Sequence, residues 1–151
     1  MKVDLQRVYI FQEGRIQKGP IVYWMSRDQR VSDNWALLYA QELAIARKEP
    51  LYVVFCLVDS FLGAPLRPYE FMLRGLSEVE RELKKKNIPF FLIQGEPSQV
   101  LPPFLCEKKA SSLVCDFSPL RLCRKWKKEV AKQIRIPISE VDARDFPQGK
   151  P

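Results

Sequence analysis

One short run, "LYVVFCLV" at residues 51–58, most constrains the fold, because every position in it is apolar. A strand with one face in water alternates apolar and polar residues, whereas a parallel strand covered on both faces has no need to alternate. The run therefore predicts a central strand of a parallel sheet with helices packed against both faces.

Further apolar runs and helical patterns alternate with this strand along the chain. Strands are expected at 21–25, 51–58, 90–93, 113–117 and 137–141, and helices at 33–48, 68–87, 102–109 and 119–134. Such alternation, with right-handed crossovers, predicts an α/β fold with an open, doubly wound, five-stranded parallel sheet and helices on both faces. The 151 residues suffice for one such domain. We expect it at 20–143, after a polar extension at 1–19 and before a tail at 144–151.

Two helices carry more specific signals. Asp33 is a suitable N-cap for the first helix, and Pro50 suits the chain just after its end. In the last helix, Leu122, Trp126, Val130 and Ile134 recur every four residues. This stripe predicts that Trp126 belongs to the core.

Several function classes are excluded by residues that the chain lacks. It contains no histidine, which removes histidine-based triads and bases and nearly every catalytic zinc site. Its six glycines are scattered and form no phosphate-binding loop. Its four cysteines form no CxxC pair and are expected to be reduced. We predict no catalytic residue and no metal site.

The N-terminus and the hydropathy pattern bear on location. The stretch "MKVDLQRVYIFQEGR" carries charges where a signal peptide would be apolar, and no apolar run reaches the roughly 18 residues of a membrane helix. We expect a cytoplasmic protein without membrane contact.

Positive charge is concentrated near the C-terminus. The chain has a net charge of +7, and residues 119–135 contain seven basic residues and one acidic residue. Such a helix can be a solvated face, or it can contact nucleic acid or an acidic partner. The sequence leaves both open, although it lacks the interleaved basic and aromatic pattern of single-strand binders.

Ligands of doubly wound sheets bind beyond the carboxyl ends of the strands. Here those ends carry "MSRDQR", "VDSFLGAPLR", "QGEPS" and "DFSPLR". Asp28 with the neighbouring arginines fits either a polar ligand contact or a salt-bridged loop. Asp33 and Asn34 favour a helix cap over a site. Asp59 and Ser118 fit either a turn or cap or a ligand contact, and Ser118 has no base to activate it.

The stretch "YWMSRDQRVSDNWALL" resembles the N-terminal signature of the photolyase and cryptochrome family. Its general form R-D-x-R-x-x-D-N-x-A-L is filled by Arg27, Asp28, Arg30, Asp33, Asn34, Ala36 and Leu37. The preceding Met25-Ser26, with Gln29 and Trp35, looks like class II cyclobutane pyrimidine dimer photolyases. Later stretches, "FCLVDSFL", "RPYEFMLRGL", "GEPS", "LVCDFSPLR" and "EVDA", resemble landmarks of that class in the same order. Pro68 and Arg144-Asp145 depart from its pattern.

This resemblance implies the Rossmann-like antenna domain of a class II deoxyribodipyrimidine photolyase, part of light-dependent DNA repair. It implies an antenna chromophore of the 8-hydroxy-deazaflavin type, with FAD in a separate helical domain, which would be the partner in cis or in trans. Contact with DNA is expected only weakly or through that domain. The chromophore contacts implied by motif position are Met25, Ser26, Arg27, Asp28, Phe55, Cys56, Leu57, Val58, Asp59, Asp116, Phe117, Ser118, Pro119 and Leu120.

Two other hypotheses compete with the antenna domain. The chain could be a stand-alone α/β module that holds a nucleotide or contacts other proteins. An independent enzyme is disfavoured, because the chain lacks both histidine and a phosphate loop.

Overall fold

The computed structural model describes residues 5–15, 17–26, 34–58, 60–61, 64–65 and 69–142. Its strands are β1 (Val8–Gln12), β2 (Ile21–Trp24), β3 (Leu51–Leu57), β4 (Ser60–Phe61), β5 (Ala64–Pro65), β6 (Phe90–Gln94), β7 (Ser112–Asp116) and β8 (Ile138–Val141). Its helices are α1 (Trp35–Arg47), α2 (Tyr69–Lys85), α3 (Pro97–Lys108) and α4 (Arg121–Gln133), preceded by a 3-10 turn at Leu5–Arg7.

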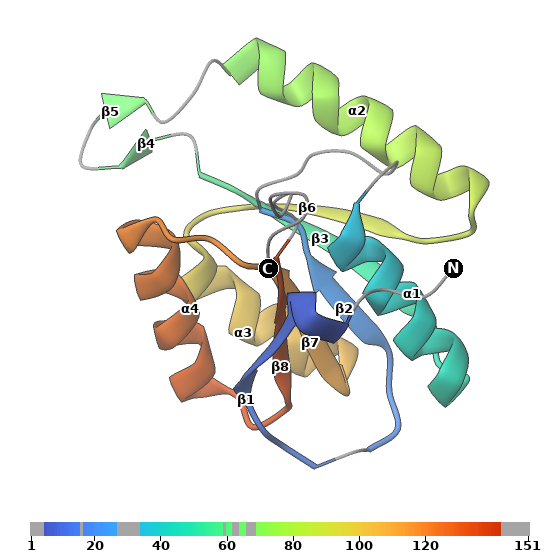
Figure 1. Cartoon of the computed structure of the whole chain (residues 1–151). Helices are drawn as coiled ribbons and strands as arrows, with labels where there is room; N and C mark the ends of the chain where they lie inside the picture. The colour runs from blue at the N-terminus through green and yellow to red at the C-terminus, as the bar shows by residue number, and fades with distance from the viewer. Residues whose placement is uncertain are drawn as a thin grey trace, which may run out of the picture.

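Within the described residues, six strands form one mixed sheet in the order β1-β8-β7-β2-β3-β6 (Figure 1). All neighbours pair in parallel except β1, which runs antiparallel to β8. The predicted α/β class is confirmed, and the five expected strands are β2, β3, β6, β7 and β8. The sixth strand comes from the N-terminal segment whose structure the sequence left undefined. A separate pair, β4 and β5, forms a small hairpin.

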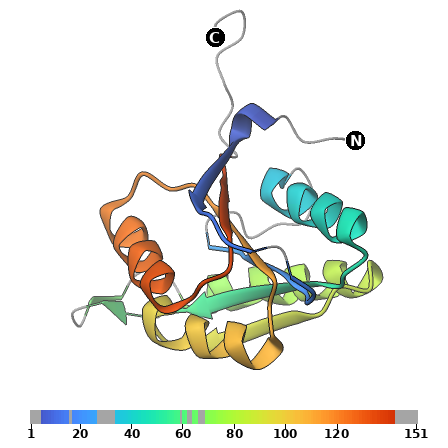
Figure 2. The same ribbon diagram turned by 90° about the horizontal axis from the view of Figure 1, so that it is seen from below.

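Two helices cover each face of the sheet (Figure 2). One core joins α1 and α2 to strand residues such as Ile21, Tyr23 and Val53. The other joins α3 and α4 to the alternate residues, among them Val22 and Val54. Six of the seven β3 residues are buried, as its continuous apolar run predicts.

The helix starts differ from the predicted residues, most at α3, and the cap of α1 also differs. The N-cap of α1 is Asn34 rather than Asp33, and its Oδ1 accepts the Leu37 N–H at 3.0 Å. Helix α3 begins at Pro97 rather than Pro102, so Pro102 lies inside it. A proline cannot donate to the carbonyl four residues earlier. That carbonyl, of Ser98, instead accepts the Gln133 side-chain amide of α4 at 2.8 Å.

In the described part of the chain, no helix is both long and apolar enough to cross a membrane.

Candidate functional site

A small hollow opens at the carboxyl ends of β2, β3 and β7, between the sheet and the α3/α4 layer. It lies where the connections from β2 and β7 leave for opposite faces, the usual ligand position in a doubly wound sheet. The residues that line it are Trp24, Ser26, Phe55, Cys56, Val58, Pro97, Cys115, Asp116, Cys123, Trp126 and Lys127. These residues leave about 60 Å³ of free space.

A buried hydrogen-bond network fixes the strand ends beside this hollow. Asp116, the last residue of β7, accepts the Tyr23 hydroxyl at 2.8 Å and the Ser26 N–H at 3.0 Å on its two carboxylate oxygens. The Asn34 amide donates to the Tyr23 hydroxyl at 3.1 Å. Asp116 and Asn34 are both buried. The ends of β2 and β7 and the start of α1 are thus held as one unit.

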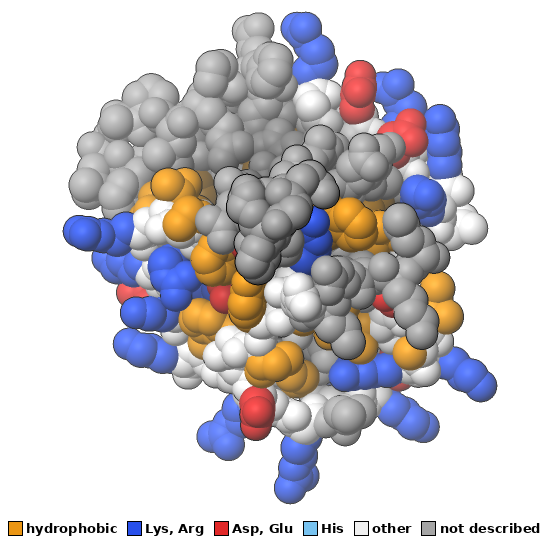
Figure 3. All heavy atoms as spheres, in the orientation of Figure 1, with side chains coloured by type: hydrophobic (Ala, Val, Ile, Leu, Met, Phe, Trp, Pro, Cys, Tyr) orange, Lys and Arg blue, Asp and Glu red, His pale blue; other side chains and the backbone are white. Residues whose placement is uncertain are grey.

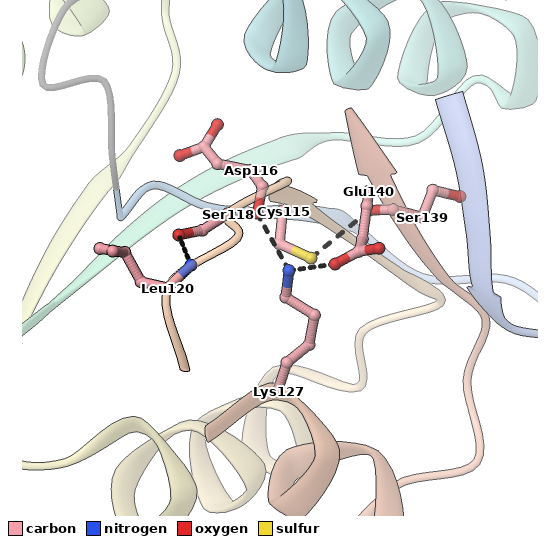
Figure 4. Close-up of polar contacts among 7 residues, drawn as sticks. All are labelled: Cys115, Asp116, Ser118, Leu120, Lys127, Ser139 and Glu140. Atoms are coloured by element: carbon pink, nitrogen blue, oxygen red, sulfur yellow. Dashed lines mark hydrogen bonds and ion pairs between the residues drawn. The ribbon is translucent and has the colours of Figure 1, made fainter. Parts of the chain in front are cut away.

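A buried ion pair lies on the α4 side of the hollow. Lys127 of α4 pairs with Glu140 of β8 and also donates to the Asp116 carbonyl at 3.1 Å. Figure 4 shows the Lys127 side chain reaching from α4 to the sheet, while the Asp116 carboxylate points away from it. Lys127 therefore belongs neither to a solvated face nor to a contact with nucleic acid or an acidic partner, the alternatives that the sequence left open for this helix. The charge of Lys127 is neutralised inside the domain.

The two buried thiols that line the hollow are poor nucleophiles. Burial raises the pKa of Cys56 to about 12. Burial also raises the pKa of Cys115 to about 12, although the positive charge of Lys127 opposes this. Since the thiolate is the reactive form, neither residue offers a nucleophile near neutral pH.

Five residues of the predicted chromophore contacts meet at the hollow: Ser26, Phe55, Cys56, Val58 and Asp116. They come from β2, β3 and β7 or from positions just after them. The predicted contacts Arg27, Asp28 and Asp59 lie outside the described residues.

The other predicted contacts lie elsewhere. Met25 and Leu57 belong to the core under α1 and α2. Ser118 is buried, and its Oγ accepts the N–H of Leu120, the residue before α4, at 3.2 Å. Phe117 packs against Tyr9 with ring centroids 5.9 Å apart. Pro119 and Leu120 are exposed.

Six lining residues were not predicted as contacts: Trp24, Pro97, Cys115, Cys123, Trp126 and Lys127. The signal that could have identified the α4 members is their spacing. Cys123, Lys127 and Val130 follow one another at intervals of four and three, so they share a helix face. That face borders the stripe of Trp126, which is buried as predicted. A lysine next to the apolar face of a helix is a candidate for a buried ion pair, as Lys127 forms here with Glu140.

The described residues contain no group of three or more metal-ligating side chains placed to hold an ion. The hollow combines tryptophan and aliphatic residues with the polar residues Ser26, Asp116 and Lys127. The carboxylate of Asp116 and the ammonium of Lys127 are held by other groups of the domain. This arrangement can hold and orient a planar ligand.

Comparison with known proteins decides the family. A family model described as DNA photolyase matches residues 21–146. The chain belongs to the DNA photolyase family. Among curated photolyases, the deoxyribodipyrimidine photo-lyase of Potorous tridactylus is 51% identical over 132 residues, which cover 86% of this chain and 25% of that protein. That of Arabidopsis thaliana is 47% identical over 150 residues, or 95% and 30% of the two chains. This photolyase-family chain thus spans less than a third of these relatives.

Solved structures of the photolyase family share the fold. A bacterial class III photolyase from Agrobacterium tumefaciens superposes with a TM-score of 0.67 at 19% identity, covering 85% of this chain and 26% of that one. A cryptochrome from Synechocystis sp. gives a TM-score of 0.66 at 18% identity, covering 82% and 26%. The chain therefore has the fold of a photolyase N-terminal domain.

Proposed function

We propose that this chain is the antenna domain of a class II deoxyribodipyrimidine photolyase or a close relative, part of light-dependent repair of cyclobutane pyrimidine dimers. The observation that carries the proposal is the hollow at the topological switch point, with Trp24 and Trp126 in its walls and strand ends fixed by hydrogen bonds. An antenna needs a fixed, mainly apolar seat for its chromophore and no acid or base. The chain is not catalytic by itself.

The residues present fit a planar aromatic chromophore of the deazaflavin type. Trp24 and Trp126, on the α3/α4 side of the sheet, offer aromatic rings, and Ser26 offers a hydroxyl. Arg27, Asp28 and Asp59 remain predicted polar contacts. When bound, the chromophore supplies light absorption, and the protein holds it at a fixed orientation.

The size of the hollow adds a condition. Pockets for drug-sized ligands enclose roughly 300 Å³ or more, compared with the 60 Å³ between the described side chains. Binding of a three-ring chromophore therefore requires the lining side chains to move apart. The side chain of Cys123 is only half-buried, so it is the least constrained part of the α4 wall.

The proposal includes a partner domain. The curated relatives are three to four times longer than the region that this chain matches. We infer that an FAD-binding helical domain supplies the redox chemistry and most of the DNA contact, in cis or in trans. The chain described here supplies the chromophore seat.

A binding titration tests the chromophore seat. We expect an 8-hydroxy-deazaflavin added to the purified 151-residue chain to gain fluorescence anisotropy and to quench Trp24 and Trp126. Cys123→Phe, which fills the hollow, should weaken binding at least tenfold. Cys106→Phe places the same bulk at an exposed cysteine of α3 and should leave binding unchanged. No binding at saturating chromophore, or equal affinity in both variants, would contradict the proposal.

A further inference from the structure

The outer side of α4 presents a row of cations, which we call the cationic stripe: Arg121, Arg124, Lys125, Lys128 and Lys132. All five are exposed or half-exposed. Figure 3 shows basic side chains gathered over α4 at the left of the view. They flank a shallow groove of about 430 Å³ on the protein surface.

The charge of the stripe is not neutralised within the described part of the chain. The ion pairs found there are Lys85 with Glu82 on α2 and Lys127 with Glu140, and neither includes a stripe residue. Glu129 is the one acidic residue of α4. Because Lys127 turns inward to its partner, the outward face carries five cations beside a single carboxylate.

The spacing of the stripe fits a periodic polyanion. A helix rises about 1.5 Å per residue, so Arg121, Lys125, Lys128 and Lys132 recur roughly every 4.5–6 Å over about 16 Å. A nucleic-acid duplex carries about one phosphate charge per 1.7 Å of its axis, or on the order of ten over that length. A duplex therefore offers a phosphate within reach of every cation of the stripe.

The chemistry of the face indicates backbone contact without base reading. Trp126, the only aromatic residue of α4, is buried against the core. Gln133, a side chain able to read base edges, is bound to the carbonyls of Ser98 and Glu129. The Arg124 guanidinium lies 6.0 Å from the centroid of the Phe117 ring and covers one face of that ring. Stacking of unpaired bases and direct base recognition therefore have few groups to use.

We propose that the cationic stripe binds the phosphate backbone of double-stranded nucleic acid, without sequence preference, and so adds a contact outside the chromophore site. It is independent of that site because the hollow uses the inward residues Cys123, Trp126 and Lys127. A failure of chromophore binding would leave this proposal standing, and the reverse also holds.

The experiment measures binding of the 151-residue chain to a fluorescein-labelled, undamaged DNA duplex by anisotropy. If the stripe neutralises about five phosphates, the logarithm of the binding constant should fall with the logarithm of the salt concentration at a slope near −4.5. The binding constant should then fall roughly 500-fold between about 50 and 200 mM salt. The triple variant Lys125→Gln/Lys128→Gln/Lys132→Gln keeps two stripe cations, so its binding constant should fall only roughly 12-fold over the same range. The matched control is Lys84→Gln/Lys85→Gln/Lys86→Gln, which removes the same charge from exposed positions at the end of α2.

The control should keep the full salt slope, and chromophore binding should be the same in both triple variants. Equal weakening by the two triple variants would overturn the proposal, since net charge alone would then explain the binding. Binding to polyglutamate but not to the duplex would also overturn it and would assign the stripe to an acidic protein partner. Tighter binding to single strands than to the duplex would refute the backbone geometry.

Discussion

The buried pair of Lys127 and Glu140 can be tested by removing its partners separately and together. Their side chains are only 4% and 6% exposed, so neither charge can turn to water when its partner is lost. Lys127→Met would leave the Glu140 carboxylate buried alone and would take a donor from the Asp116 carbonyl. Breaking a buried pair in this way costs about 3–5 kcal/mol.

The reciprocal change, Glu140→Leu, should cost about as much, because it leaves a buried ammonium without its carboxylate and with the hydrogen bond to the Asp116 carbonyl. The double variant removes both charges. Its remaining cost is the lost hydrogen bond from Lys127 to the Asp116 carbonyl, about 1–3 kcal/mol. The double variant should therefore be more stable than either single variant, and its loss should be far smaller than the sum of theirs.

The measurement is urea unfolding followed by circular dichroism and tryptophan fluorescence. A domain of this size has roughly 5–15 kcal/mol of stability, so each single loss should move the midpoint clearly. Lys128→Met, the neighbouring exposed lysine, is the control and should leave the midpoint unchanged. The interpretation of a buried, coupled pair would be refuted if Lys127→Met lowered the free energy of unfolding by less than about 1 kcal/mol. It would also be refuted if the loss in the double variant equalled the sum of the losses in the two single variants.

Two further predictions concern the rim and the thiols. Asn34→Ala should lower the free energy of unfolding by about 2 kcal/mol, because it removes the helix cap and the hydrogen bond to Tyr23. Asn34→Ser keeps an oxygen that can cap the helix, so it should lower the free energy of unfolding by about half as much. An equal loss in the two variants, measured by urea unfolding, would contradict a capping role. At pH 8, Cys106 should react quickly with a disulfide reagent and Cys56 and Cys115 only on unfolding. Burial raises the pKa of Cys56 and Cys115 from 9.0 to about 12. Because the folded state favours the protonated thiols, their full contribution to the free energy of unfolding is present below pH 9. That contribution is lost as the pH rises from 9 toward 12. Rapid reaction of either buried thiol would contradict this.

The sequence predicts the parallel core well because its physical signal is local. The run at 51–58 is apolar throughout, and the structure buries it on both faces as β3. The edge strand β1 gives a weaker signal. Its pattern VYIFQ leaves Tyr9 and Ile10 exposed, and its pairing depends on β8, more than 120 residues away. No local rule reports such a partner.

The rim of the site shows the same division. That residues after β2 and β7 meet follows from parallel topology, and the structure joins Ser26 to Asp116. The choice of Asn34 over Asp33 as the cap does not follow from residue type, because both side chains can cap. It agrees with a tertiary contact, since Asn34 also has an amide that donates to Tyr23. Cap selection here is coupled to packing beneath the helix.

Helix α4 shows how one segment can serve two surfaces. Its inward residues Trp126 and Val130 fill the core, and Lys127 crosses that layer to reach Glu140. Charges counted along the sequence do not separate the basic residues of α4 by face. In the structure, Lys127 points into the domain, whereas the residues of the cationic stripe lie on its outer side. The inward lysine fixes α4 to β8 and so fixes one wall of the hollow. A variant that loosens this pair should therefore weaken chromophore binding, while duplex binding, which depends on exposed cations, should change less.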